Sequence, residues 1–231
     1  MKDLIVCSYA THRAGMLDEY ESQLEAAGID FHLEPVTLAD GINSVTARWK
    51  FEYMRRMCEQ FSDYSRIVLT DAWDVLFFGA KENLMKNLPE CFTVSTERNC
   101  WPEEQIAAGI IGDSLWRFCN PGMMAGSPER ILSWLRFMDE PRVCLLDLGE
   151  QAWFNRLVAY DHFSIARDLH TQVFYTVSAD KECGELQVDY KGWPWNSRYN
   201  TSPQFFHFSG KCPTEPFRET MYTGKPLCAS A

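Results

Sequence analysis

The stretch over residues 66–78, RIVLTDAWDVLFF, constrains the fold of this chain more than any other part of its sequence. It opens with a short apolar run, Ile67–Leu69, of the kind that forms a buried strand. Asp71 and Asp74 follow with two residues between them, and apolar residues then resume. Open α/β sheets bind ligands at the carboxyl ends of their strands, and aspartate is rarely buried without a partner. We therefore interpret the pair as hard oxygen ligands for Mn²⁺ or Mg²⁺, ions that often bridge to phosphate oxygens, in preference to a surface turn with an aspartate at each end.

Composition limits the classes of protein to which the chain can belong. Its 231 residues suffice for a substantial core and show no repeat, low-complexity tract or linker, so we expect a single domain over residues 1–231. The net charge of -10 argues against binding to nucleic acid or to anionic membranes. No apolar run reaches the roughly 18 residues that a membrane span needs.

The cysteines favour a reducing compartment. The chain has nine, an odd number without a C-x-x-C motif, and several lie in apolar runs. Buried free thiols therefore explain them better than disulfides do. The N-terminal residues enter a strand pattern directly, without a visible signal peptide, so we expect a cytoplasmic protein.

Strand and helix patterns alternate through the first third of the chain. We expect strands at Leu4–Tyr9, at Phe31–Leu38 and in the run that ends at Asp71. Amphipathic helices are predicted between them, over residues 15–27 and 46–61. This order indicates an α/β fold with a mostly parallel sheet and right-handed crossovers.

The rest of the chain is less regular. We expect a helix at 80–88, a strand at 91–95 and helices that begin near residues 127 and 147, and we leave 103–116 unassigned. Residues 118–126 are interpreted as a tight passage of small residues, and the chain after Val173 as aromatic and irregular.

His207 is a candidate third metal ligand. It lies between two phenylalanines, where a histidine is more often a core residue. A turn and a cation follow at once, Gly210 and Lys211, an arrangement suited to holding phosphate oxygens. An imidazole beside two carboxylates would favour Mn²⁺, and the residues alone leave the two interpretations equally supported.

Other residues suit both a functional and a structural role. Glu150 stands at a predicted helix start, where an acid is usually only a cap. Trp73 suits stacking on a nucleobase or an ordinary core position, and the segment 120–122 suits a simple turn. A dehalogenase-type phosphatase is excluded, because its aspartates are one residue apart and its nucleophile would end the first strand.

Taken together, these motifs resemble the glycosyltransferase domain of the procollagen lysyl hydroxylases and their galactosyltransferase relatives. TDAWDVLF at 70–77 is similar to the family's T-D-S-Y-D-V-hydrophobic-F, with Trp73 in place of tyrosine. The remaining matches, in chain order, are SYAT at 8–11, VSTE at 94–97, Trp101-Pro102, the passage 120–126, EQAWF at 150–154 and HFSGK at 207–211. The resemblance runs, with gaps, from the first strand to about residue 215.

The resemblance implies a GT-A fold with a Rossmann-type, mostly parallel central sheet flanked by helices. Residues 1–100 would form a nucleotide-binding half and 101–231 a sugar and acceptor half. The implied activity is transfer of a hexose, glucose or galactose, from a UDP-sugar to an acceptor hydroxyl, with Mn²⁺ (or Mg²⁺) as the metal. The implied metal ligands are Asp71, Asp74 and His207.

The resemblance also assigns roles around the donor sugar. Glu150, with Asp147, would be the general base or would stabilise the sugar cation. A basic residue early in the second helix corresponds to Arg48 or Lys50, and the alignment does not choose between them. The donor contacts are Thr11 and Trp73 at the uridine and Lys211 at the diphosphate, with Asn120, Gly122 and Gly210.

Departures from the family pattern limit which properties of the family can be expected of this chain. Glu150 replaces an aspartate, and Pro121 and Met123–Met124 change the expected sugar pocket, so the hexose stays open. Because the hydroxylase part does not occur in these 231 residues, we expect a stand-alone microbial or viral-type enzyme with another acceptor: a protein, a glycan or a small molecule.

Two other functional classes are weighed against the transferase. A non-catalytic nucleotide-sugar or glycan-binding domain with the same fold is the alternative, although a decayed site tends to lose its metal ligands. Nucleotidyl transfer would need a glycine-rich basic loop after the first strand, which residues 10–15 do not supply. The acceptor, the stereochemical outcome and the oligomeric state stay open.

Overall fold

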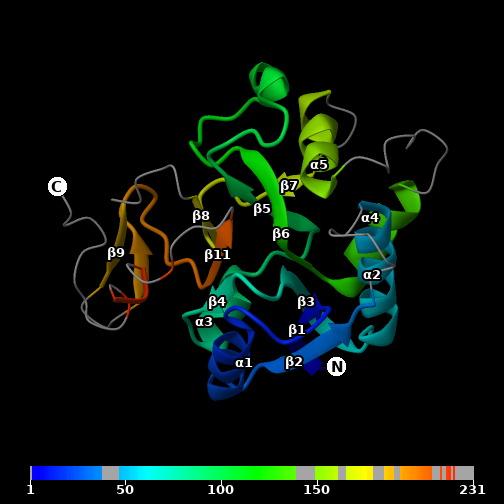
Figure 1. Ribbon diagram of the computed structural model, residues 1–231, viewed down its shortest axis with the longest axis vertical. Helices are drawn as coiled ribbons and strands as arrows, with labels where there is room; N and C mark the ends of the chain where they lie inside the picture. Colours follow the sequence, from blue (N-terminus) through cyan, green and yellow to red (C-terminus); the bar gives the residue numbers. More distant parts are fainter. Residues whose placement is uncertain are drawn as a thin grey trace.

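The computed structural model describes residues 2–37, 47–138, 149–160, 165–178, 185–189, 193–209, 214, 217–219 and 221. Strands and helices alternate from residue 2 to residue 71 (Figure 1). The helices are α1 (Leu17–Ala26), α2 (Ala47–Gln60), α3 (Lys81–Asn87), the 3₁₀ helix η1 (Glu104–Gly109), α4 (Pro128–Met138) and α5 (Glu150–Ala159). The strands are β1 (Lys2–Ala10), β2 (Asp30–Pro35), β3 (Tyr64–Asp71), β4 (Val75–Phe77), β5 (Thr93–Glu97), β6 (Phe118–Gly126), β7 (Ala166–Arg167), β8 (Phe174–Ser178), β9 (Leu186–Val188), β10 (Pro194–Asn196) and β11 (Phe205–Ser209).

A six-stranded sheet in the order β2-β1-β3-β6-β5-β7 forms the centre of the protein. β1 pairs in parallel with both β2 and β3, and β5 pairs in parallel with β7. β6 runs antiparallel to β3 and β5. The expected α/β class and mostly parallel sheet are confirmed, with β6 as the reversed strand.

The interpretation of residues 118–126 as a small-residue passage was wrong, because they form β6, which is buried along its whole length. Its turn-forming residues Asn120, Pro121 and Gly122 lie where the register between β5 and β6 shifts. A bulge tolerates a proline, which has no N–H to donate, and a glycine inside a strand. The pattern therefore looked like a turn, although the strand continues through it.

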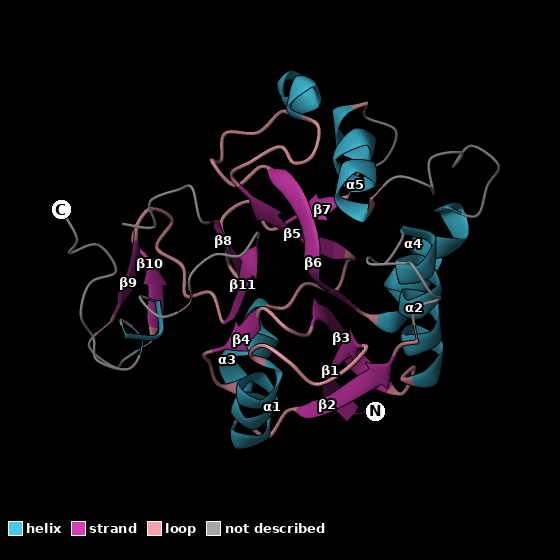
Figure 2. Ribbon diagram, viewed as in Figure 1, coloured by secondary structure: helices cyan, strands magenta, loops and turns pink. Residues whose placement is uncertain are grey.

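Different helices cover the two faces of the central sheet because side chains alternate along each strand. Ile5 and Cys7 of β1 pack with Phe51 of α2, Leu135 of α4 and Trp153 of α5. The intervening strand residues, such as Leu4 and Val6 of β1, pack in a second cluster. Its helix members include Tyr20 and Leu24 of α1 and Leu84 of α3. Figure 2 shows α2, α4 and α5 on one side of the sheet and α1 and α3 on the other.

Two smaller sheets complete the fold. β11 lies between β4 and β8, antiparallel to the first and parallel to the second. This pairing joins a late strand to the segment that directly follows the aspartate pair. β9 and β10 form an antiparallel hairpin beside it. The expectation of an irregular chain after Val173 was therefore wrong in part, since the strands there are short and their aromatic residues fill the core.

The remaining predicted elements fall close to their observed bounds. The helices expected over 15–27, 46–61 and 80–88 are α1, α2 and α3, and the strand expected at 91–95 is β5. The unassigned segment 103–116 contains η1. The helix expected to begin near residue 147 is α5, which begins at Glu150 within the described residues.

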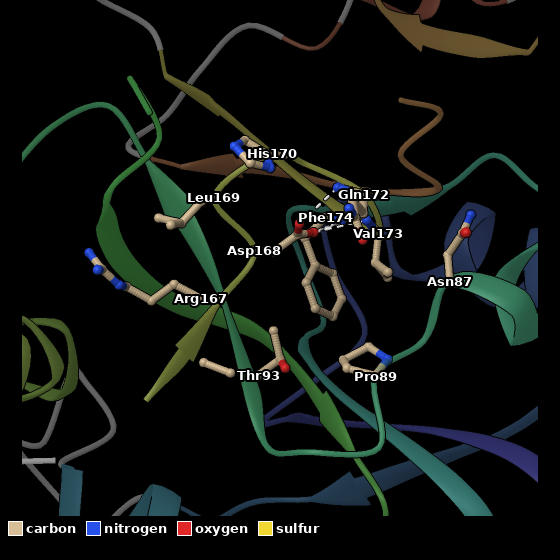
Figure 3. A pocket seen from close by; sticks show the side chains of 11 residues that line it. Asn87, Pro89, Thr93, Arg167, Asp168, Leu169, His170, Gln172, Val173 and Phe174 are labelled. Carbon is tan, nitrogen blue, oxygen red and sulfur yellow. Dashed lines mark hydrogen bonds between the residues drawn. The ribbon is translucent and has the colours of Figure 1, made fainter. Parts of the chain in front are cut away.

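Asp168 stabilises the turn that leads into β8. Its carboxylate accepts backbone hydrogen bonds from Gln172, Val173 and Phe174 at 2.8–2.9 Å, as Figure 3 shows. Burial raises the pKa of Asp168, and these three bonds oppose the shift. A cavity of about 250 Å³ lies beside this turn. Since the carboxylate is engaged by the backbone, we assign Asp168 a structural role.

Two further observations bear on the sequence-based expectations. The described cysteines, Cys7, Cys58, Cys91, Cys100 and Cys119, are free thiols, and all but Cys91 are buried. Within the described part of the chain, no helix combines the length and apolar character needed to cross a membrane.

Candidate active site

Asp71, Asp74 and His207 converge at the end of the central sheet. Asp71 ends β3, and Asp74 immediately precedes β4. β11 pairs with β4 so that His207 is opposite Val75, and the backbone N–H of Phe208 donates to the carbonyl of Asp74 at 2.8 Å. The strand pairing therefore delivers the imidazole beside the two carboxylates.

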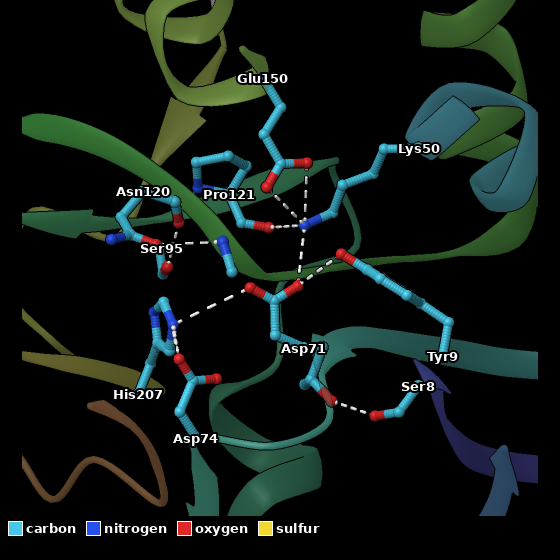
Figure 4. A network of polar contacts seen from close by, with 12 residues as sticks. Ser8, Tyr9, Lys50, Asp71, Asp74, Ser95, Asn120, Pro121, Glu150 and His207 are labelled. Carbon is cyan, nitrogen blue, oxygen red and sulfur yellow. Dashed lines mark hydrogen bonds and ion pairs between the residues drawn. The ribbon is translucent and has the colours of Figure 1, made fainter. Parts of the chain in front are cut away.

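The three side chains have the spacing of a metal-binding group. His207 Nε2 lies 3.3 Å from Asp74 Oδ2 and 3.9 Å from Asp71 Oδ2 (Figure 4). One ligand atom from each residue lies within 4.8 Å of the others. Adjacent and opposite ligands of an octahedral ion at about 2.1 Å are roughly 3.0 and 4.2 Å apart. This oxygen–oxygen–nitrogen donor set fits Mn²⁺ or Mg²⁺.

The local charge also favours a cation. Burial by itself would lower the pKa of His207, but the charge of Asp74, its hydrogen bond and the charges of Asp71 and Glu97 raise it to about 9. Burial would raise the pKa of Asp74, and the imidazolium of His207 lowers it below its usual value. The protonated imidazole thus places a positive charge beside the carboxylates of Asp74 and Asp71.

Lys50 connects Asp71 to Glu150. Its Nζ donates to Asp71 Oδ1 at 3.1 Å, to the carbonyl of Pro121 at 2.8 Å and to Glu150 Oε1 at 3.1 Å. Burial would lower the pKa of Lys50, and the charges of Asp71 and Glu150 raise it above its usual value. Arg48 is exposed, so Lys50 is the basic residue of α2 that the fold brings into the site.

Tyr9 is a site residue that the sequence analysis missed. β1 and β3 are in register so that Tyr9 is opposite Asp71, and the phenol donates to Asp71 Oδ1 at 2.8 Å. Its ring packs edge-on against Trp49 and Tyr53 of α2. Burial and the charge of Asp71 raise the pKa of Tyr9 well above its usual value, so the phenol stays a donor. The signal in the sequence was its position at the end of a strand parallel to β3.

Glu150 lies at the first position of α5, on the opposite side of Lys50 from Asp71 (Figure 4). Burial raises the pKa of Glu150 to about 7, the charge of Asp71 adds to the shift, and Lys50 opposes it. A carboxyl group that titrates near neutral pH suits proton transfer. The structure thus places the predicted Glu150 next to the metal-ligand group, with Lys50 hydrogen-bonded to both Glu150 and Asp71.

Gly122 of β6 lies against His207, and Asn120 is its neighbour two residues earlier in the strand. A Cβ added at Gly122 would lie 2.6 Å from Nδ1 of the imidazole. The Asn120 side-chain oxygen accepts the backbone N–H of Gly122 at 3.0 Å, and Ser95 Oγ donates to the Asn120 carbonyl. These contacts set the shape of the chain where the histidine packs.

Glu97 is the second residue that sequence reasoning missed as part of the site. It ends β5, is buried and accepts a hydrogen bond from the side chain of Gln151 in α5. Its charge contributes to the raised pKa of His207. The motif that contains Glu97 supported the family resemblance, but no role was assigned to the residue.

Thr11 and Trp73 lie at the rim of the site. Trp73 is 40% exposed and follows Ala72 in the turn between the two aspartates. Its indole N–H donates to the carbonyl of His12 at 2.9 Å, and its ring contacts the His12 ring. Thr11 bonds to His12 Nδ1 at 2.9 Å. The structure therefore brings both predicted uridine contacts to one exposed edge, with His12 between them.

Three of the predicted site residues, Asp147, Gly210 and Lys211, lie outside the described residues. Their roles stay predictions.

Comparisons with known proteins relate the chain to one protein family and to solved structures of similar fold. A family model described as the PLOD GT domain matches residues 2–215. Among solved structures, the galactosyltransferase LgtC in complex with donor and acceptor sugar analogues superposes with a TM-score of 0.52 at 12% identity, over 98% of each chain. A glycosyltransferase involved in glycosylation of the major capsid of PBCV-1 gives a TM-score of 0.49 at 12% identity, over 96% of this chain and 100% of that one. A search of curated proteins finds no match.

Proposed function

Because this chain belongs to the PLOD GT-domain family and has the fold of GT-A glycosyltransferases, we propose that it transfers a hexose, glucose or galactose, from a UDP-sugar to an acceptor hydroxyl. The observation that carries the proposal is the convergence of Asp71, Asp74 and His207 beside the Lys50–Glu150 pair. The acceptor is a protein, a glycan or a small molecule.

In this proposal, Asp71, Asp74 and His207 hold Mn²⁺ or Mg²⁺. When bound, the ion would act as a Lewis acid that neutralises charge on the departing diphosphate. The residues around Asp71 support this role. Lys50 and Tyr9 both donate to Oδ1 of Asp71, whereas Oδ2 faces His207. Such outer hydrogen bonds orient a ligating carboxylate.

The exposed rim suits the nucleoside. Trp73 offers a ring face whose orientation is held by the hydrogen bond to His12, and a base can stack on such a face. Thr11 would contact the uridine beside it. Asn120 and Gly122, with Gly210 and Lys211, would contact the sugar and diphosphate end of the donor, so residues 1–100 would bind mainly the nucleotide and residues 101–231 the sugar and acceptor.

Glu150 is the proposed group at the reacting sugar, with Asp147 as a second acid. The pKa of Glu150 near 7 permits it to accept a proton from the acceptor hydroxyl, and its ionised form would stabilise an oxocarbenium-like centre. Lys50 Nζ lies 3.1 Å from both oxygens of Glu150, so the carboxylate keeps a defined orientation.

A thermal-shift titration tests the donor site. UDP, GDP and ADP are each added with Mn²⁺ and with EDTA to the wild type and to Asp74→Ala. A ligand at 100 times its Kd adds about 2.7 kcal/mol of stability. We expect a UDP-selective shift that requires Mn²⁺ and is lost in Asp74→Ala. The absence of any nucleotide shift would refute the proposal, and UDP binding without UDP release from any UDP-hexose would favour the non-catalytic alternative.

A further inference from the structure

A cavity of about 310 Å³ lies away from the metal-ligand group, between α3, the β9–β10 hairpin and the segment that leads into β11. Gln204 lines it, and His207 is three residues further along, a separation of about 10 Å in extended chain. The two side chains have different neighbours: Gln204 lies against Gly79, and His207 lies against Gly122. The cavity is therefore separate from the candidate active site.

Gln204 brings a buried polar group without a partner to this cavity. It is 4% exposed, and within the described part of the chain its Oε1 has no hydrogen-bond partner. A Cβ at Gly79 would lie 2.6 Å from Gln204 Cδ, so the glycine leaves the room that the amide occupies. A buried carbonyl of this kind is stabilised by a donor from a ligand.

One face of α3 adds more hydrogen-bonding groups. Asn83, Lys86 and Asn87 are spaced i, i+3 and i+4, so they lie on the same side of the helix, and all three line the cavity. Leu84 is buried in the core. Among the described residues, the side chains of Asn83, Lys86 and Asn87 have no hydrogen bond or ion pair, and they are exposed.

The hairpin supplies an apolar wall. Trp193 and Pro194 line the cavity from the start of β10. The backbone of Trp193 is tied to Asp189 by two hydrogen bonds, from Trp193 N to Asp189 Oδ1 at 2.9 Å and from Asp189 N to the Trp193 carbonyl at 2.8 Å. A half-buried indole with a fixed backbone is a flat surface on which the apolar face of a sugar ring can pack.

The polar and charged side chains that line the cavity indicate which class of ligand would bind there. Amide side chains donate and accept, which matches vicinal hydroxyl groups. Among the described residues, the lining carries one cation, Lys86, and one carboxylate, Asp189, a balance that favours a neutral ligand over a strongly charged anion. Its volume falls at the lower end of the range of about 300–1,000 Å³ for small-molecule pockets.

We propose that this cavity binds a neutral saccharide unit. Resting on the proposed function, this unit is a sugar of a glycosylated acceptor, remote from the hydroxyl that receives the hexose. Such a second site would favour acceptors that already carry a glycan, because one molecule then contacts both sites.

Saccharide binding is tested without metal or nucleotide. Methyl glycosides of glucose, galactose and mannose, together with lactose and maltose, are added at millimolar concentration in EDTA and followed by saturation-transfer NMR and tryptophan fluorescence. We expect at least one of them to bind the wild type. Binding should be at least tenfold weaker in Asn83→Ala/Asn87→Ala and in Trp193→Ala. Glu82→Ala, an exposed change on the same helix but outside the cavity lining, should bind as the wild type does.

The same variants are titrated with UDP and Mn²⁺, which should bind unchanged in all of them. The proposal is overturned if no saccharide binds the wild type, or if binding survives both the double variant and Trp193→Ala. It is also overturned if saccharide binding is lost in Asp74→Ala, because the sugar then occupies the candidate active site. Saccharide binding at α3 without any UDP response would refute the donor site alone.

Discussion

Gly122 controls where the imidazole of His207 can lie. A methyl group at this position would come within 2.6 Å of Nδ1, and the ring is buried, so the imidazole must leave its present position beside Asp71 and Asp74. We expect Gly122→Ala to weaken Mn²⁺ binding about 10- to 100-fold, as the loss of a positioning contact does. Calorimetric titration with Mn²⁺ measures this change.

Gly112→Ala is the matched control for this prediction. A Cβ at Gly112 would make an ordinary contact of 3.5 Å with Arg117 Cβ, away from the ligands. Its Mn²⁺ affinity should equal that of the wild type. Equal affinity in Gly122→Ala would show that His207 does not need this space and would argue against its role as a ligand.

The positive charge of Lys50 offsets the negative charges of two carboxylates, Asp71 and Glu150. Lys50 is 1% exposed, and Asp71 and Glu150 are each about a quarter exposed. Removal of one partner from a buried ion pair costs about 3–5 kcal/mol, and the partial exposure of both acids reduces that figure. We expect Lys50→Met to lower the free energy of unfolding by about 2–3 kcal/mol in urea titrations with EDTA.

Two further variants separate charge from packing at Lys50. In Lys50→Met/Glu150→Gln one of the uncompensated acids is gone, so part of the lost stability should return. Arg48→Met, an exposed neighbour, should change stability by no more than about 0.5 kcal/mol. A double variant as unstable as Lys50→Met would attribute the loss to packing.

Glu150 predicts a pH dependence of stability. Its pKa is about 7 in the folded protein and about 4.5 in the unfolded chain. Between these values the folded state binds the proton more tightly, so the contribution of Glu150 to stability falls as pH rises from about 4.5 to 7. Glu150→Gln cannot titrate. We therefore expect the wild type to lose stability relative to this variant across that window, measured by urea titrations with EDTA. A constant difference would contradict the shift.

At the scale of elements, the loop after β1 packs on the turn between β3 and β4. Gly15 has φ +61°, the Met16 N–H donates to the Trp73 carbonyl at 2.9 Å, and a Cβ at Gly15 would overlap that carbonyl oxygen. Gly28 has φ +66° but open space around its Cβ position. These two glycines share the backbone constraint and differ only in the contact.

A comparison of alanine substitutions at Gly15 and Gly28 tests whether the contact with Trp73 supports the rim of the site. Gly28→Ala should lose about 1–2 kcal/mol, the usual cost of a left-handed conformation. Gly15→Ala should lose more and should also weaken UDP binding, because the loop that contains Thr11 and His12 must shift from Trp73. Urea unfolding and a UDP–Mn²⁺ titration check both. Equal stabilities, with unchanged UDP affinity, would show that the loop does not depend on this contact.

β11 is the element that assembles the candidate site from distant parts of the chain. Its pairing with β4 sets His207 opposite Val75, and its pairing with β8 ties it to the C-terminal part of the fold. The sequence identified the histidine but supported a core role equally well. A short aromatic strand carries no local signal for its partner, since many strands would accept it.

At the scale of the whole molecule, local periodicity predicted β1, β2, β3 and the helices α1, α2 and α3 close to their bounds. β6 and the short strands β8–β10 were not predicted. Their residues, such as Asn120–Gly122, have turn-forming character, and long-range pairing overrides it. The family resemblance is confirmed by the match over residues 2–215, whereas the UDP-hexose donor and the cytoplasmic location stay predictions.

The sequence by itself determined the α/β class and the aspartate pair, because a buried strand and the two acids that follow it are neighbours in the chain. Only the tertiary structure decided that Lys50 and not Arg48 enters the site, that Tyr9 shares Asp71 with it, and that Gly122 makes room for the histidine. Those contacts depend on which strands pair and in which register. Register is set by the burial of whole faces of the sheet, a property of the packed chain and of no short segment within it.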